Sequence, residues 1–77
     1  LVHPREVFKA ALLANSHALI VAHNHPAGSL TPSQEDLDVT ETLIKAGKLL
    51  GVSVVDHVIV TATGLTSLRE THGYLWP

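Results

Sequence analysis

Two histidines, a serine and an aspartate stand at spacings that could build a metal site. His23 and His25 are separated by one residue, and Ser33 and Asp36 follow after seven further residues. In an extended chain residues i and i+2 point to the same side, so both imidazoles can reach one ion. Ser33 and Asp36 are i and i+3, which places them on one face of a helix's first turn. The spacing predicts a metal ion held by His23, His25 and Asp36.

This ligand set predicts a hydrolytic zinc site. Two neutral imidazoles and one carboxylate are typical of catalytic Zn²⁺, which keeps a fourth position for water. With a single anionic ligand the ion stays positive and lowers the pKa of its water from ~15.7 toward ~7. The hydroxyl of Ser33 could donate to the oxyanion that forms on an attacked carbonyl, which makes Ser33 the candidate catalytic residue. The alternative for Ser33 is an ordinary serine at a helix start, and other divalent ions also fit the set.

The remaining four histidines are interpreted as residues outside the metal site. His57 follows Asp56 in an apolar strand pattern, which favours a hydrogen-bonded structural histidine over a ligand. His3, His17 and His72 have no metal-ligand spacing and are predicted to be surface or capping residues.

A helix and a strand are predicted to lead up to the histidine pair. Pro4 is typical of a first helical residue, and the helix is expected to run to about residue 15. The side chains expected to face the core are Val7, Ala10, Ala11 and Ala14. The apolar run at residues 18–22 predicts a strand buried on both faces. The residue before a proline avoids the α region, so Pro26 is expected to hold His25 extended.

A second, longer helix is predicted to carry the aspartate. Thr31 is expected to cap it, with Pro32 in the first turn and Gln34 completing a capping box. Gly51 is expected to end it in a left-handed conformation. Its predicted core face is Leu37, Thr40, Ile44, Gly47 and Leu50, with Gly47 marking close packing.

The rest of the chain predicts a hairpin. Residues 52–63 read as a strand, Gly64 as a turn and residues 65–69 as a second strand, whereas residues 72–77 fit no pattern. At the other end, Leu1 and Val2 resemble the tail of a strand whose start is missing. The order of elements predicts an α/β fold.

Composition limits the function classes. The chain has 77 residues, which is one domain at most, no cysteine and a formal net charge of −2. Five Lys and Arg residues leave no basic patch for nucleic acid. The apolar runs are shorter than the ~20 residues that cross a bilayer, so no membrane partner is expected. The lack of cysteine and of a leader pattern favours a cytoplasmic protein. Oligomeric state leaves no sequence signal.

The motif resembles a known family. His23-x-His25, seven residues, Ser33, two residues and Asp36 is similar to the JAMM motif of the MPN (JAB1/MPN/Mov34) metalloproteases. The stretches 23–28 and 31–36 resemble the RadC branch, as do residues 3–8, 56–59 and 67–70 in the same order.

The resemblance implies a fold and an activity. It implies that residues 1–77 are one truncated RadC-like JAB/MPN domain, a cytidine-deaminase-like mixed sheet flanked by helices whose N-terminal strands are missing. It also implies Zn²⁺ on His23, His25 and Asp36, with Ser33 stabilising the transition state of peptide or isopeptide hydrolysis.

The general base is the gap in this interpretation. In the family the catalytic glutamate lies on a strand upstream of the histidine pair, and no position here matches it. Glu6 falls in the first helix and Glu35 lies inside the metal motif, so neither is assigned the role. We therefore expect this chain to bind metal with impaired catalysis.

Two other functions stay open. One is a role on DNA, because the family carries a DNA-repair label and the one-letter codes of His23-Asn24-His25 match the name of a nuclease class. The net negative charge argues against DNA as a direct ligand. Alternatively, the ion only joins the loop to the helix in a non-catalytic interaction module, since zinc can stabilise a small fold outright.

Overall fold

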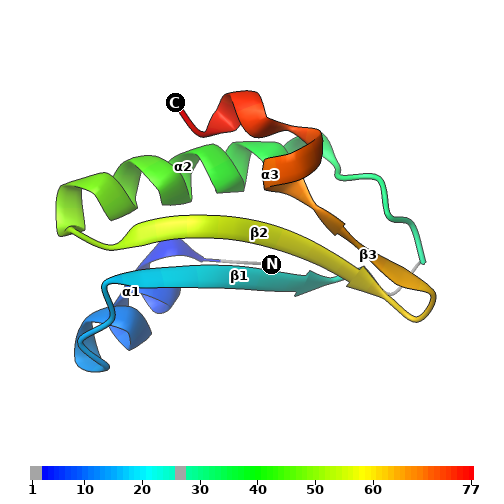
Figure 1. The fold of residues 1–77 in the computed structure, drawn as a ribbon. Coiled ribbons are helices and arrows are strands. Elements are labelled where there is room, and N and C mark those ends of the chain that lie inside the picture. Colours follow the sequence, from blue (N-terminus) through cyan, green and yellow to red (C-terminus); the bar gives the residue numbers. More distant parts are fainter. Residues whose placement is uncertain (1–2, 26–27) are drawn as a thin grey trace.

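Helices and strands alternate in the computed structural model, which describes residues 3–25 and 28–77 (Figure 1). The elements are α1 (Pro4–Leu13), β1 (Ala18–Asn24), α2 (Gln34–Leu50), β2 (Ser53–Thr61), β3 (Gly64–Ser67), α3 (Leu68–Thr71) and a 3₁₀ turn (Gly73–Leu75). The predicted strand end at Leu1 and Val2 and the predicted effect of Pro26 on His25 lie outside the described residues.

The described strands form one mixed sheet in the order β1-β2-β3. β1 and β2 are parallel and α2 makes the crossover between them, while β2 and β3 form an antiparallel hairpin. This confirms the predicted α/β class with a mixed sheet flanked by helices. The strand predicted over residues 65–69 ends at Ser67, because the Ser67 side chain accepts the backbone N–H of Glu70 and caps α3.

The prediction that the first strand is buried on both faces was wrong. Among the described residues β1 pairs with β2 alone, and only Val21 is fully buried in it. Ile20 is 63% exposed. A continuous apolar run does not distinguish a central strand from a strand at the edge of the described sheet.

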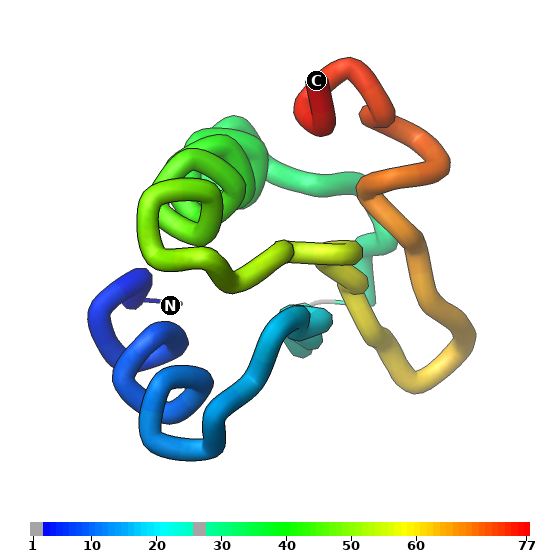
Figure 2. The backbone as a smooth tube through the Cα atoms, turned by 60° about the vertical axis from the view of Figure 1, so that its left-hand side comes forward, coloured from blue at the N-terminus to red at the C-terminus, as the bar shows by residue number. Residues whose placement is uncertain are grey.

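The core lies between the sheet and two neighbouring helices, α1 in blue and α2 in green (Figure 2). Its members are Phe8, Ala11, Val21, Leu43, Ile44, Val52, Val54 and Leu75. The predicted face of the first helix was partly wrong, because Phe8 is buried while Ala10 and Ala14 are exposed. In the second helix Leu43 is buried where Leu50 was expected.

Close packing at Gly47 is confirmed. A Cβ atom added to Gly47 would lie 2.3 Å from the carbonyl oxygen of Val52. Gly51 ends α2 at φ 75°, in the predicted left-handed conformation. Together these glycines let the chain turn directly from the end of α2 into β2.

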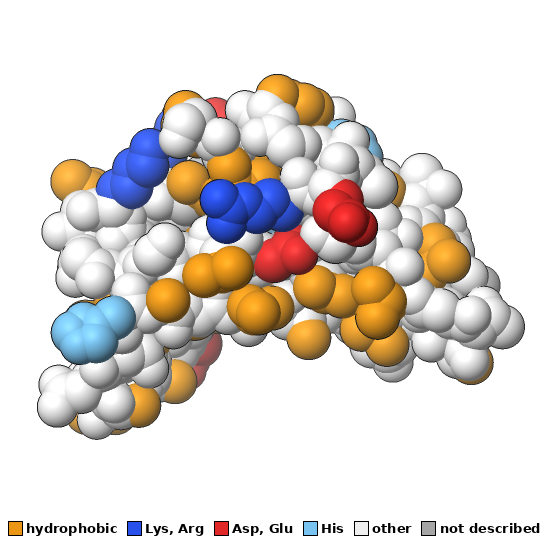
Figure 3. Space-filling model, viewed as in Figure 1, with side chains coloured by type: hydrophobic (Ala, Val, Ile, Leu, Met, Phe, Trp, Pro, Cys, Tyr) orange, Lys and Arg blue, Asp and Glu red, His pale blue; other side chains and the backbone are white. Residues whose placement is uncertain are grey.

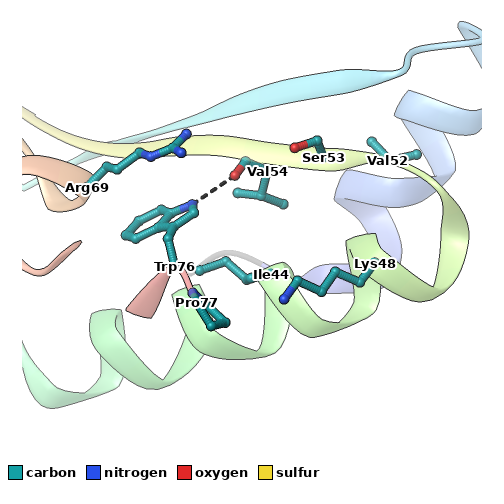
Figure 4. A pocket seen from close by; sticks show the side chains of 8 residues that line it. All are labelled: Ile44, Lys48, Val52, Ser53, Val54, Arg69, Trp76 and Pro77. Carbon is teal, nitrogen blue, oxygen red and sulfur yellow. Dashed lines mark hydrogen bonds between the residues drawn. The ribbon is translucent and has the colours of Figure 1, made fainter. Parts of the chain in front are cut away.

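The C-terminal segment, which the sequence left unassigned, packs beside β2. The indole Nε1 of Trp76 donates to the carbonyl oxygen of Val54 at 2.8 Å (Figure 4). Lys48 and Arg69 line the same pocket as Trp76. None of the residues lining this pocket belongs to the predicted metal site.

Apolar side chains are spread over the lower half of the face shown in Figure 3. Large exposed apolar side chains come from strands and helix ends, among them Leu13, Ile20, Leu49 and Leu65. In residues 3–25 and 28–77, no helix has the length and hydropathy needed to cross a bilayer.

Candidate metal centre

The structure brings the two histidines and the aspartate together at the C-terminal end of β1. His23 Nδ1 lies 3.1 Å from Asp36 Oδ1, and His25 Nε2 lies 3.0 Å from Asp36 Oδ2. One potential ligand atom from each residue lies within 4.8 Å of the others. The parallel crossover explains this, because α2 begins above the end of the strand that precedes it.

These distances fit a shared ion. Two ligand atoms at about 2.1 Å from one tetrahedral ion are roughly 3.4 Å apart. Each imidazole lies at nearly this distance from a different Asp36 oxygen, 3.1 Å for His23 and 3.0 Å for His25, so either oxygen could serve as the ligand. Asp36 is only 5% exposed. The side chain of His23 is 22% exposed and that of His25 is 17% exposed. The group is thus mostly shielded, but open enough to be reached from solvent.

The imidazole hydrogen bonds also fit a metal site. His25 Nδ1 lies 2.9 Å from the carbonyl oxygen of Ser29, which can only accept, so the ring proton is on Nδ1. The Nε2 lone pair of a neutral His25 then faces a carboxylate oxygen, an arrangement that requires a proton or a cation between them. Among the described residues His23 Nδ1 is buried without a hydrogen-bond partner, because its close approach to Asp36 lacks hydrogen-bond alignment.

Asp36 is held in its anionic form. Burial alone would raise its pKa, but hydrogen bonds from Ser33 and the nearby His23 and His25 outweigh burial and hold the pKa of Asp36 below its ordinary value of 3.8. The carboxylate is therefore charged at neutral pH, as a metal ligand must be.

Ser33 rather than Thr31 caps α2. Its Oγ accepts from the backbone N–H of Asp36 at 3.1 Å, and the Asp36 carboxylate accepts from the backbone N–H of Ser33 at 2.8 Å. The predicted box of Thr31 with Gln34 was therefore wrong. A carboxylate accepts more strongly than an amide, which favours the box that Asp36 completes.

The hydroxyl of Ser33 is already engaged by the carboxylate. Ser33 Oγ donates to Asp36 Oδ2 at 2.9 Å. Ser33 therefore orients the predicted ligand in this structure, and its role toward an oxyanion stays a prediction.

The other candidate residues lie elsewhere. Glu6 is exposed on α1 and Glu35 is exposed in the first turn of α2. His3 and His17 are exposed, and His72 lies at the end of α3, as expected for surface or capping residues. Within the described ranges, the group able to hold a metal contains none of these five.

A β-bulge turns His57 toward the site. The parallel register pairs Leu19 with Val54 but Ile20 with Asp56, so it skips Val55. This shifts the strand by one residue, and His57 instead of Asp56 faces α2, fully buried. The backbone N–H of His57, not its imidazole, donates to Asp56 Oδ1 at 2.7 Å.

His57 contacts the group formed by His23, His25 and Asp36 from its buried side. Its ring stacks on that of His23 with centroids 5.9 Å apart, and its Nδ1 lies 2.5 Å from Thr40 Oγ1. Burial, followed by the charge of His23, lowers the pKa of His57, so the ring is neutral near pH 7. Sequence reasoning missed this contact because the bulge has no obvious sequence signal.

Comparison with known proteins identifies the family. A family model described as RadC-like JAB domain matches residues 1–74. The chain therefore belongs to the RadC-like JAB domain family, whose implied metal cofactor agrees with the His23, His25 and Asp36 group.

Its relatives include several UPF0758 proteins. The chain is 54% identical over 70 residues to UPF0758 protein STH371 of Symbiobacterium thermophilum, covering 91% of this chain and 30% of that protein. It is 57% identical over 70 residues to a UPF0758 protein of Thermotoga maritima, covering 91% of this chain and 32% of that protein. The chain thus spans about a third of the length of these relatives.

Proposed function

We propose that this chain forms the Zn²⁺ centre of a hydrolase that cleaves a peptide or isopeptide bond. The observation that carries the proposal is the pairing of each Asp36 oxygen with one imidazole nitrogen, at 3.0 and 3.1 Å. Membership of the RadC-like JAB family supports a metal-dependent activity.

The charges of the ligand set suit hydrolysis. When bound, Zn²⁺ would lower the pKa of a water molecule and polarise the substrate carbonyl. The residues contribute one negative charge from Asp36 and neutral imidazoles from His23 and His25. Such a set leaves the centre with a net positive charge, which favours an anionic transition state.

Ser33 is proposed to stabilise the transition state. Its hydroxyl lies beside the ligand carboxylate and is exposed, so a rotation of its side chain would release Asp36 and point the proton at a developing oxyanion. The backbone N–H of Ser33 would keep Asp36 Oδ2 bound during that rotation.

The proton acceptor is proposed to come from outside these residues. In the described part of the chain Asp36 is the one carboxylate of the group that could hold a metal, and it is proposed as a ligand rather than as the base. The longer relatives have about two thirds of their length outside the matched region, and that part has room for an acidic residue.

A test uses the UPF0758 protein of Thermotoga maritima, whose full length includes the matched region. The zinc-loaded protein is incubated with fluorogenic peptides and isopeptide-linked lysine peptides. We expect cleavage that disappears when the counterpart of His23 is changed to alanine. Changing the counterpart of Ser33 to alanine should lower kcat by about 10²–10³, as for loss of one oxyanion donor.

One observation favours a second function, a non-catalytic metal-binding module. The Ser33 hydroxyl is already used by Asp36, and the ligands join β1 to α2, as a purely structural ion would. Full zinc occupancy without cleavage of either substrate class would support this function and contradict the hydrolase. Metal-dependent nicking of duplex DNA without cleavage of either peptide class would contradict the proposed peptide or isopeptide substrate.

A further inference from the structure

We propose that His57 is a positioning residue that fixes the spacing between the ligands on β1 and the ligand on α2. The proposal rests on the proposed metal centre and extends it to a residue outside the ligand group. It starts from the position of His57, which contacts both halves of that centre from β2.

The first contact is with the α2 side. Thr40 Oγ1 donates to the backbone carbonyl oxygen of Asp36 at 2.7 Å and lies 2.5 Å from His57 Nδ1. Because the hydroxyl hydrogen goes to the carbonyl, Thr40 can only accept from His57. The ring proton is then on Nδ1, and a continuous chain of hydrogen bonds runs from His57 through Thr40 to Asp36.

The second contact is with the β1 side. The His57 ring lies nearly parallel to that of His23, with an interplanar angle of 22°. His57 pairs with Val21 in the sheet register and His23 pairs with Ile59, so the two histidines are diagonal neighbours on one face. The ring of His57 thus packs against the ring of His23 and restricts its position.

The unsatisfied nitrogen of His57 argues against a purely structural residue. His57 is fully buried, and among the described residues its Nε2 has no hydrogen-bond partner. Burying a nitrogen without a hydrogen-bond partner carries a desolvation penalty, which an apolar side chain in the same space would avoid. The feature that leucine could not replace is the Nδ1 contact to Thr40, which leads to the metal centre.

His57 also stands apart from the ligands. The cluster of potential ligand atoms in residues 3–25 and 28–77 comprises His23, His25 and Asp36 without His57. Residues that orient metal ligands typically change metal affinity 10–100-fold when they are replaced. A positioning role therefore predicts weaker binding with unchanged stoichiometry.

The test measures Co²⁺ binding to the chain by chelator competition, with the visible spectrum of the bound ion as a report of ligand geometry. His57→Leu removes both ring nitrogens, and His57→Asn keeps a polar group at the Nδ1 position. Thr40→Val removes only the hydroxyl. Thr42→Val is the matched control, because exposed Thr42 makes the same i−4 bond, to Asp38 O at 3.0 Å.

We expect His57→Leu and Thr40→Val to weaken Co²⁺ binding 10–100-fold and to alter the spectrum. His57→Asn and Thr42→Val should keep the wild-type affinity and spectrum. The double variant with His57→Leu and Thr40→Val should lose little more than either single variant, because both break one chain of bonds. If His57→Leu does not fold, the comparison of Thr40→Val with His57→Asn still tests whether the Nδ1–Thr40 contact affects Co²⁺ binding.

Two results would overturn the positioning role. One is wild-type affinity and spectrum in Thr40→Val and His57→Leu. The other is a His57→Asn variant that folds but binds as weakly as His57→Leu. Failure of the wild-type chain to bind Co²⁺ would instead contradict the proposed metal centre itself, so the two failures are distinguishable.

Discussion

Ser33 and Asp36 bind each other through three hydrogen bonds, two from Ser33 to the Asp36 carboxylate and one returning from the Asp36 backbone to Ser33 Oγ. The bonds that begin α2 are therefore the same bonds that orient the proposed ligand. Helix capping and the proposed metal binding share one carboxylate, and each should depend on the other.

Replacing the cap should destabilise the metal-free protein. Ser33→Ala removes the hydroxyl that caps α2, and loss of such a cap costs about 0.5–2 kcal/mol. For a domain of this size each kcal/mol lowers Tm by about 4–8 °C. Ser33→Thr retains the hydroxyl and should stay near the wild-type Tm in thermal unfolding followed by circular dichroism. An unchanged Tm in Ser33→Ala would show that the cap contributes nothing.

Burial of neutral His57 should make stability depend on pH. Folding lowers the pKa of His57 below its ordinary value of 6.5. At a pH between the lowered pKa and 6.5, the unfolded chain therefore binds a proton at this residue that the folded chain does not. The free energy of unfolding of the metal-free protein should therefore fall as pH drops below about 6.5.

A histidine variant isolates this effect. Urea unfolding between pH 5 and 8, the range in which histidine titrates, should show a shallower dependence for His57→Asn. His17→Asn, which removes an exposed histidine, is the control and should resemble the wild type. Equal slopes for wild type and His57→Asn would contradict the burial of a neutral ring.

Gly47 should tolerate no side chain. The methyl group of Gly47→Ala would lie 2.3 Å from Val52 O, so the backbone must move. We expect a loss of about 1–3 kcal/mol from overpacking, although alanine is the better helix former by ~1 kcal/mol. Gly73→Ala, where no atom lies within 4 Å, should change stability little. A more stable Gly47→Ala in urea unfolding would show that α2 and β2 are less closely packed.

Local spacing was enough to predict which residues of the proposed site lie together. The His23-x-His25 pair and the i, i+3 spacing of Ser33 and Asp36 depend only on backbone geometry. The apolar runs and Gly51 likewise predicted the order of elements and the end of α2.

Features set by tertiary contacts were not predictable. The alternation of β2 predicts Asp56 on the face of Val52 and Val54, and only the bulge at Val55 places His57 there. The choice of Ser33 over Thr31 as the cap depends on a carboxylate that accepts the backbone N–H of Ser33. The oxygens of the same carboxylate lie beside two imidazole nitrogens. The exposure of β1 depends on which strands pair with it, and an apolar run does not indicate that.

The most direct test of the metal centre is zinc stoichiometry measured by elemental analysis together with calorimetric titration. We predict one equivalent of Zn²⁺ in the wild-type chain and in His3→Ala. Binding should be lost in His23→Ala, His25→Ala and Asp36→Asn, each checked for folding by circular dichroism. One equivalent of zinc retained in all three of these variants, or none in the wild type, would contradict a centre built on His23, His25 and Asp36.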